Sequence, residues 1–488
     1  MVLATFVAIP VYADPGDVIY VDQANDSGTE NGSSWATAYT TLADGIEAAR
    51  INFGGDVWVA GGTYDENRLN GGAIQLRPTV NIYGGFDGTE NQRIQRAPLA
   101  NVTVIDGSTS DSGAPAETVV FGTNNTIMDG FTIQGGQGDN GVGMTNIGVS
   151  PVITDCVFTS NTATQSNGTT GFGAGMLNVN GAAPLLTDCV FTNNNADQSG
   201  GGMANTDSSP TLMGCRFSIN TAGEAGGAIF NNGDSNPVIE NCIFDRNEAN
   251  NGGAIFNESA NPVIKASEFL LNDALAFGGA LFNNNTADVL VINSVFGENH
   301  ATTGGGAISN LNAIFTGVNC SIVANTSDGD GGAFFNNEST TDVLNSVIWY
   351  NSEEWIGNVS SVTGIRWCNV GGSDPGPNNI AEEPRFTDMD NRDYSLKPDS
   401  PNINAATEEG APLADILGIP RPQDAGVDMG AYEATVVDLP DPPLECTGIV
   451  LSAGATPPGP GSGDALLLGL IAIVFMLAGL SKRKHTFI

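Results

Sequence analysis

The chain has very little positive charge. Of its 488 residues only 16 are Lys or Arg, against 54 Asp or Glu, which gives a formal net charge of −38. Proteins that bind nucleic acids need clusters of Lys and Arg to contact phosphates. The composition therefore argues against nucleic acid as a partner. It is consistent with a soluble exterior surface and with binding of divalent cations.

Helix-length apolar periodicity is absent from the middle of the chain, where Gly, Asn and Thr dominate. The segment 226–251, GGAIFNNGDSNPVIENCIFDRNEANN, holds three short apolar runs at 228–230, 237–239 and 242–244. Short apolar runs bounded by turn residues indicate strands. A helical repeat would need two amphipathic segments, and a leucine-rich repeat would need Leu at fixed offsets, so both are excluded.

Two sequence columns repeat eight times. The first is a Gly/Ala-rich turn that ends in Asn, with steps of 32, 27, 26, 26, 26, 27 and 26 residues: Asn146, Asn178, Asn205, Asn231, Asn257, Asn283, Asn310 and Asn336. The second pairs an apolar residue with Asn three positions later: Phe158/Asn161, Phe191/Asn194, Phe217/Asn220, Phe244/Asn247, Phe269/Asn272, Phe296/Asn299, Ile322/Asn325 and Ile348/Asn351. A fixed period of this size indicates stacked supersecondary units.

The repeat predicts an all-β fold, a right-handed single-stranded parallel β-helix of the pectin-lyase-like type. We expect the Asn side chains to serve left-handed turns and to bond from coil to coil. Cysteine or serine stands two residues before the apolar member of the second column, at Cys156, Cys189, Cys215, Cys242 and Cys320. Neighbouring coils lie about 4.8 Å apart, whereas a disulfide needs Cβ atoms about 3.8 Å apart, so free thiols are expected. Cys368 and Cys446 are placed outside this ladder.

The chain divides into six parts. Residues 1–13 are apolar and end in a small-x-small pattern, which predicts a signal peptide; the alternative is a buried first strand. Residues 14–126 form an N-terminal cap and the first coils, with a short amphipathic capping helix at 40–50. Regular coils span 127–372, a C-terminal cap spans 373–435, and a Pro/Gly-rich linker spans 436–463. Residues 464–488 are an apolar segment with a basic tail, which predicts a membrane-anchor or sorting helix; a plain tail anchor is the alternative.

Several motifs resemble those of bacterial right-handed β-helix surface proteins of the choice-of-anchor Q type. They are GSSWATAY (32–39), NIYGGFDGTE (81–90), DGFTIQGG (129–136), DYSLKPDSPNINA and DMGAYE. The GGAI and FxxN units also resemble the repeats of chlamydial polymorphic outer membrane proteins. These resemblances imply a cell-surface protein and, for the second family, adhesion. Neither resemblance implies catalytic residues.

One group of residues could support catalysis. The position after the second-column Asn holds Glu248, Asp273 and His300 in three successive coils. Carboxylates about 5 Å apart can act as nucleophile and acid in glycoside cleavage, and Arg246 could bind an acidic sugar. A solvated turn is the alternative. The chain has only four Lys and two His, and segments typical of polygalacturonases are absent.

Two acidic loops are candidate calcium sites, since hard cations prefer oxygen ligands. They contain Asp388, Asp390 and Asp393 in one loop and Asp328 and Asp330 in the other. Plain Asx-rich turns are the alternative, and no other cofactor is expected.

The sequence therefore predicts a secreted, cell-envelope-anchored β-helix rod that binds a carbohydrate or protein ligand, with adhesin-like or envelope-structural function. The alternative is a polysaccharide-cleaving enzyme, a hydrolase or lyase, on the same scaffold. The nearly constant coil length favours binding, because an enzyme needs long loops to build a groove with paired acids. A passive spacer without a ligand is a third possibility.

Overall fold

The computed structural model describes residues 18–65, 73–109, 113–165, 170–352, 354–372, 376 and 378–434. The predicted signal peptide, the whole Pro/Gly-rich linker and the apolar C-terminal segment lie outside these residues. Within them, no helix is both long enough and apolar enough to cross a membrane.

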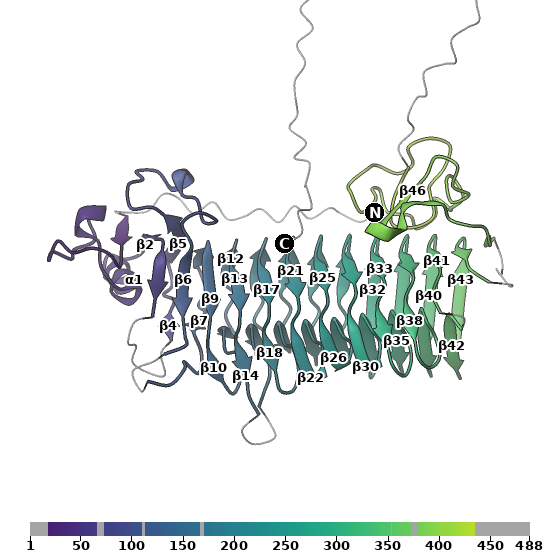
Figure 1. Ribbon diagram of the computed structural model, residues 1–488, viewed down its shortest axis with the longest axis horizontal. Coiled ribbons are helices and arrows are strands. Elements are labelled where there is room, and N and C mark those ends of the chain that lie inside the picture. The colour runs from purple at the N-terminus through teal and green to yellow at the C-terminus, as the bar shows by residue number, and fades with distance from the viewer. Residues whose placement is uncertain are drawn as a thin grey trace, which may run out of the picture. The chain divides into compact units, whose positions relative to one another are not determined.

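The strands of the coils form four parallel sheets that run along a right-handed solenoid (Figure 1), and a separate two-stranded antiparallel sheet lies near the C-terminal end of the described residues. Sheets A, B, C and D contain 13, 12, 11 and 8 strands. One coil passes through β24 (Val238–Glu240) in A, β25 (Ile243–Asp245) in B, β26 (Glu248–Asn251) in D and β27 (Ile255–Glu258) in C. The predicted parallel β-helix is confirmed.

The interior is filled by side chains stacked from coil to coil. Six Phe rings of the second column stack almost parallel, with centroids 4.6–5.2 Å apart: Phe158, Phe191, Phe217, Phe244, Phe269 and Phe296. They share one continuous core with Met176, Ile229 and Ile255 of the first column. Each coil therefore buries its apolar side chains against its two neighbours.

Both Asn columns are buried ladders of amide hydrogen bonds. In the first column, each Asn from 146 to 310 donates its Nδ2 to the Oδ1 of the next Asn at 2.8 Å. In the second column the amide makes more bonds. Asn247, for example, donates to Asn272 Oδ1 and to the Phe217 carbonyl, and it accepts from the Asn220 backbone N–H and side chain. The predicted coil-to-coil bonding is confirmed.

The expectation that these Asn residues occupy left-handed turns is wrong. None of them has a positive φ; the residue just before the second-column Asn does, at Ser160, Asn193, Ile219, Arg246, Leu271, Glu298, Ala324 and Tyr350. In the first column the bend lies five residues earlier, as at Gly226, where φ is +63°. The Asn backbone stays extended because its amide must point inward to bond the next coil.

The six cysteines in the described residues are free and buried. Burial raises the pKa of Cys156, Cys320 and Cys368 to about 12. Cys368 was placed outside the ladder, and this was wrong: the Ser346 N–H donates to its Sγ at 3.3 Å, so it forms the next rung. Cys368 follows Ser346 by 22 residues, whereas the two preceding steps of the ladder are 26 residues each. This shorter step hid the place of Cys368 in the repeat.

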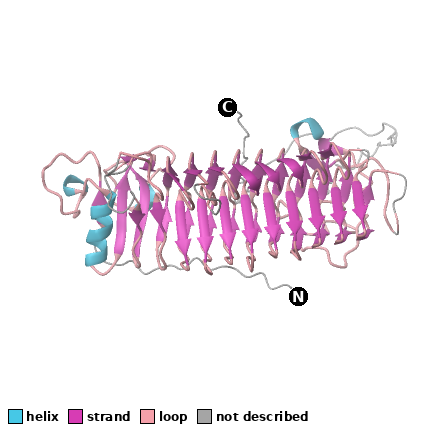
Figure 2. Cartoon of the chain, turned by 90° about the horizontal axis from the view of Figure 1, so that it is seen from below, coloured by secondary structure: helices cyan, strands magenta, loops and turns pink. Residues whose placement is uncertain are grey.

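The N-terminal end is closed by α1 (Leu42–Ile51), as predicted apart from one or two residues at its ends. Thr41 caps the helix by accepting the Asp44 N–H at 3.1 Å. Leu42, Ile46 and Ala49 pack into the solenoid core beside β2 (Gly55–Ala60). Figure 2 shows the helix across the end of the strands.

Residues 378–434 lie along the side of the last coils. They include β45 (Phe386–Asp388), η3 (Met389–Asn391) and β46 (Asp393–Leu396). Phe386, Tyr394 and Met429 pack on the outward-facing Val295, Val323 and Val347 of sheet B. The corner residues Asn319 and Asn345 donate to the carbonyls of Asp428 and Thr407 at 3.0 and 2.8 Å. The segment predicted as a cap thus covers a lateral face of the solenoid.

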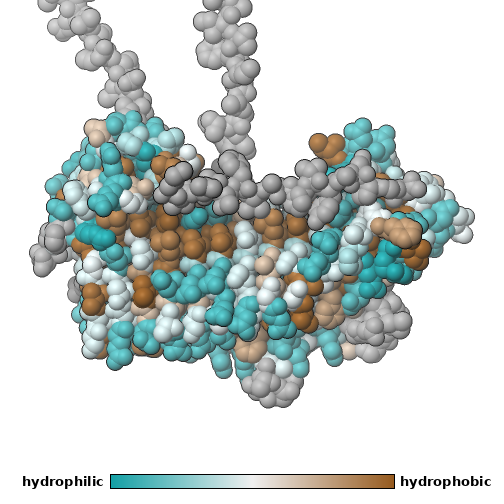
Figure 3. Space-filling model, turned by 180° about the vertical axis from the view of Figure 1, so that it is seen from behind, coloured by the Kyte–Doolittle hydropathy of each residue, from teal (hydrophilic) through white to brown (hydrophobic). Residues whose placement is uncertain are grey.

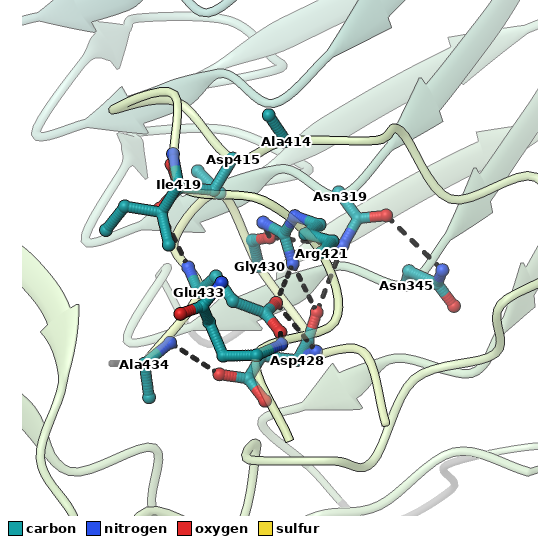
Figure 4. A network of polar contacts seen from close by, with 12 residues as sticks. Asn319, Asn345, Ala414, Asp415, Ile419, Arg421, Asp428, Gly430, Glu433 and Ala434 are labelled. Atoms are coloured by element: carbon teal, nitrogen blue, oxygen red, sulfur yellow. Dashed lines mark hydrogen bonds and ion pairs between the residues drawn. The ribbon is translucent and has the colours of Figure 1, made fainter. Parts of the chain in front are cut away.

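A buried ion pair holds this segment together (Figure 4). Arg421 contacts Glu433 at 2.8 Å, and their side chains are 0% and 1% exposed. Arg421 also donates to the carbonyls of Asp428 and Gly430. Burial raises the pKa of Asp428 to about 6, although its carboxylate accepts the N–H groups of Asn404 and Ala434.

Sheet A carries apolar side chains on its outer face beside this segment. Ile292, Val318 and Leu344 occupy successive register positions there and are half-buried. Figure 3 shows an apolar band on this side of the molecule.

We expect Asn247→Ala to lower the free energy of unfolding by about 2–4 kcal/mol, because each buried group left unpaired costs about 1–3 kcal/mol. Urea unfolding followed by circular dichroism measures the change. Asn236→Ala is the control, since Asn236 is exposed; its effect should stay within about 0.5 kcal/mol. Equal effects of the two substitutions would contradict the ladder's role.

We expect Arg421→Met to destabilise residues 378–434 by about 3–5 kcal/mol, because the buried carboxylate of Glu433 loses its positively charged partner. Limited proteolysis should then cut within this segment while the coils stay intact. The double variant Arg421→Met/Glu433→Gln should recover part of the loss. Unchanged proteolysis of the single variant would show that the ion pair does not hold the segment.

Candidate functional site

The acidic column lies in register on sheet D. Glu248 of β26 pairs with Asp273 of β30 (Asp273–Phe277), and Asp273 pairs with His300 of β34 (His300–Ala301). The predicted stacking of the three residues is therefore observed. Arg246 is engaged elsewhere, in an ion pair with Asp245 at 3.0 Å.

His300 lies between two carboxylates. Its Nδ1 is 2.8 Å from Asp273 Oδ1, and its Nε2 is 3.5 Å from Asp328 Oδ1. Burial lowers the pKa of His300, but the hydrogen bonds and charges of Asp273 and Asp328 outweigh this, so the pKa is raised above 6.5. The contact with Asp328, one of the calcium candidates, was not predicted.

The column lies on an open turn. The His300 and Asp273 side chains are 35% and 47% exposed, and Glu248 is exposed. None of the three lines either of the two hollows described below. No hydrogen bond of the Glu248 side chain is seen within the described part of the chain. The column therefore forms a solvent-exposed ion pair between His300 and Asp273. It does not form a pair of acids that encloses a substrate.

The candidate calcium residues are engaged in turns. Asp388 accepts the backbone and side-chain N–H groups of Asn391, and Asp393 accepts from Ser395. Asp388 and Asp390 line a hollow of about 530 Å³ that also contains Arg385 and Lys397. In the ranges that the structure describes, no three His, Cys, Asp or Glu side chains converge as metal ligands. The calcium site stays a prediction.

A larger hollow of about 620 Å³ lies where sheets D and C meet. We call it the aromatic groove. Its lining residues are Asn140, Phe172, Leu177, Val179, Ser199, Thr206, Glu224, Ala225, Phe230, Asn232, Asn251, Phe256 and Glu258. It spans four strands of sheet C, β15 (Met176–Val179), β19 (Met203–Thr206), β23 (Ile229–Asn232) and β27. At about 4.8 Å per strand it is on the order of 15 Å long.

The floor of the groove is formed by outward-facing side chains of sheet C. Phe230 and Phe256 lie in register, with ring centroids 5.7 Å apart, and Phe172 lies 6.0 Å from Phe230. Phe230 and Phe256 are only 6% and 7% exposed, so their rings are held firmly by neighbours. Val179, Thr206, Asn232 and Glu258 form a parallel outer row.

The wall comes from one column of sheet D and its corner. Phe172, Ser199, Ala225, Asn251 and Phe277 are bridged in that order. Large rings stand at both ends of this run and small side chains lie between them. The groove therefore opens because three wall positions lack the ring that their neighbours carry.

Sequence analysis missed this site. The floor residues precede the first-column Asn by one position, and the wall residues precede it by six, so both follow the repeat. Phe recurs at 230, 256, 282 and 335, each time one position before a first-column Asn, and this recurrence could have indicated an aromatic row on the outer face of the sheet. The two Asn columns contribute no exposed binding surface in these coils, because their side chains are buried.

One family model matches a part of the chain. The Chlamydia polymorphic membrane protein repeat matches residues 241–258, which confirms the resemblance of the repeat units. The match spans β25, β26 and β27, and Asn251, Phe256 and Glu258 of the last two strands line the groove. The resemblance to the choice-of-anchor Q type is not tested by this match. A comparison with curated protein sequences found no match.

Several solved structures are similar to the chain at low identity. A pectate lyase is 15% identical, with 85% of this chain and 96% of that chain covered and a TM-score of 0.47. The A-module of a mannuronan C-5 epimerase from Azotobacter vinelandii is 12% identical, with 75% and 100% covered and a TM-score of 0.32. The catalytic unit of an α-1,3-glucanase from Streptomyces thermodiastaticus is 14% identical, with 76% and 70% covered and a TM-score of 0.34.

We expect His300 to titrate above pH 6.5, since the two carboxylates favour its charged form. The ion pair should stabilise the fold fully below pH 6.5 and lose this effect as the pH rises through the folded-state pKa. Proton NMR of the imidazole can follow this, because the chain has only two His. His300→Gln assigns the signal, and Asp273→Asn should lower the midpoint. A midpoint below 6.5 in the unmodified protein would contradict the assignment.

Proposed function

We propose that this protein is a cell-surface β-helix that binds a carbohydrate in the aromatic groove, as an adhesin-like or envelope-structural rod. The observation that carries the proposal is a rigid aromatic floor beside a wall of small and polar side chains. The apolar C–H face of a sugar ring can pack on the half-buried Phe172 and Leu177 and on the exposed edges of Phe230 and Phe256. Its hydroxyl groups can bond to Asn232, Asn251 and Glu258. Ligand sites commonly combine an apolar surface with a few polar groups in this way.

The surface location rests on separate observations. The polymorphic membrane protein repeat at 241–258 is typical of a surface protein. The predicted signal peptide and apolar tail point the same way, as does the acidic composition. If the signal peptide exports the chain and the apolar tail retains it in the membrane, the solenoid is held outside the cell.

Polysaccharide cleavage is the second candidate. Glu248 and Asp273 are register neighbours on strands about 4.8 Å apart, which is close to the carboxyl separation of about 5–5.5 Å in a retaining glycosidase. Their exposure on an open turn argues against this role, because enclosure strengthens the electrostatic interactions on which such catalysis depends. Binding without cleavage is the better supported function.

The groove can be tested by filling it. Ala225→Phe places an aromatic ring at this wall position, as Phe172 and Phe277 do at their own wall positions. We expect binding to be lost on a glycan array while the thermal unfolding midpoint stays within a few degrees. Ala225→Ser is the matched control and should bind normally. Retention of all glycan binding by Ala225→Phe would refute the groove as the site.

Cleavage is measured in the same experiment by the release of reducing ends, with and without calcium. Glu248→Gln/Asp273→Asn is the relevant variant. We expect no release from any polysaccharide by either protein. Release that the double variant abolishes would replace the binding proposal with the enzymatic one.

A further inference from the structure

The aromatic groove contains negative charge and no positive charge. Glu224 contributes a carboxylate from the wall and Glu258 contributes one from the floor, and the lining has no Lys, Arg or His. We infer that the ligand of the groove is an uncharged or amino-bearing saccharide and that polyuronates and sulfated glycans are excluded. This inference rests on the proposed carbohydrate-binding function and adds the class of ligand.

Neither carboxylate is neutralised by the protein. Glu258 Oε1 accepts a hydrogen bond from Asn285 Nδ2 at 3.3 Å, and Glu224 is exposed. Across the described ranges no ion pair involves either residue. Both charges are thus available to a ligand, and a bound carboxylate or sulfate would meet them directly.

The basic side chains of these coils and of the next coil lie on other sheets. Arg216 and Arg246 both contact Asp245 at 3.0 Å on sheet B, and Lys265 lies on sheet A. The net charge of −38 adds repulsion at longer range. Recognition of a polyuronate normally uses Arg or Lys against its carboxylates, and the groove offers neither.

Polarity changes along the groove. Phe172, Leu177 and Val179 lie at one end, beside the amide of Asn140, whereas Asn232, Asn251 and Glu258 lie at the other end, beside Phe256. The first end is the more apolar of the two. A ligand with hydroxyl or ammonium donors fits the polar end. A methyl or acetyl substituent fits the apolar end, where it would cover Phe172 and Leu177.

The test compares oligosaccharides of equal length on the full chain by isothermal titration calorimetry at two salt concentrations. The panel is glucose, N-acetylglucosamine, glucosamine and galacturonate oligomers. We expect the galacturonate oligomer to bind at least tenfold more weakly than the tightest ligand. Binding of a neutral oligomer should not change with salt, whereas binding of the glucosamine oligomer should weaken, because salt screens charge interactions.

The carboxylates are tested by Glu224→Gln/Glu258→Gln. We expect this variant to bind galacturonate about tenfold more tightly than the unmodified protein and glucosamine more weakly. Glu240→Gln, on the outer face of sheet A, is the matched control and should change neither affinity. The opposite result is that the galacturonate oligomer binds most tightly in the panel and that this binding is lost in Ala225→Phe. This result would overturn the inference about charge but leave the proposed carbohydrate-binding function standing. Absence of saccharide binding in the panel and on the array would overturn both.

Discussion

The buried amide ladders determine the register on which everything else in this structure depends. In each ladder one amide donates to the next, so every coil must align with its neighbours within a fraction of an ångström. A slip by one residue would turn every inward side chain outward. It would also leave several buried amides unpaired, which is costly in an apolar core. The Phe stack adds burial but would tolerate small shifts, whereas the hydrogen bonds do not.

Because the interior enforces register, the exterior is free to vary. The outward positions of sheet C change from Leu to Ala to Phe without disturbing the coil, and the wall column changes from Phe to Ser, Ala and Asn. The groove arises from this variation alone. Its lining positions follow the repeat, so the nearly constant coil length did not exclude a hollow. The length argument had counted only against an enzyme's groove with paired acids.

The distribution of charge follows the same division. Inside the coils, the polar groups are mostly neutral amides and hydroxyls, and most of them are hydrogen-bonded; Asn146 Oδ1 and Ser309 Oγ are exceptions. Outside, carboxylates dominate, and the few Arg side chains are mostly paired with them, as Arg216 and Arg246 are with Asp245. Arg421 and Glu433 are the exception to this division, because both charges are buried inside the lateral segment. There the carbonyls of Asp428 and Gly430 add bonds that help to offset the cost of removing the charges from water.

The sequence by itself determined the coil. The two columns, with their period of 26 or 27 residues, predicted the parallel β-helix, the inward stacking, the free thiols and the capping helix, since each is a direct result of local periodicity. The tertiary structure alone decided which outward positions face one another. Ala225 and Phe230 line one groove because the chain turns at Gly226, and the angle of that corner cannot be read from a repeat. The same holds for the lateral placement of residues 378–434, for His300 between Asp273 and Asp328, and for Cys368, whose rung follows a shortened coil. These contacts join residues that the repeat does not relate, so only the packed chain could establish them.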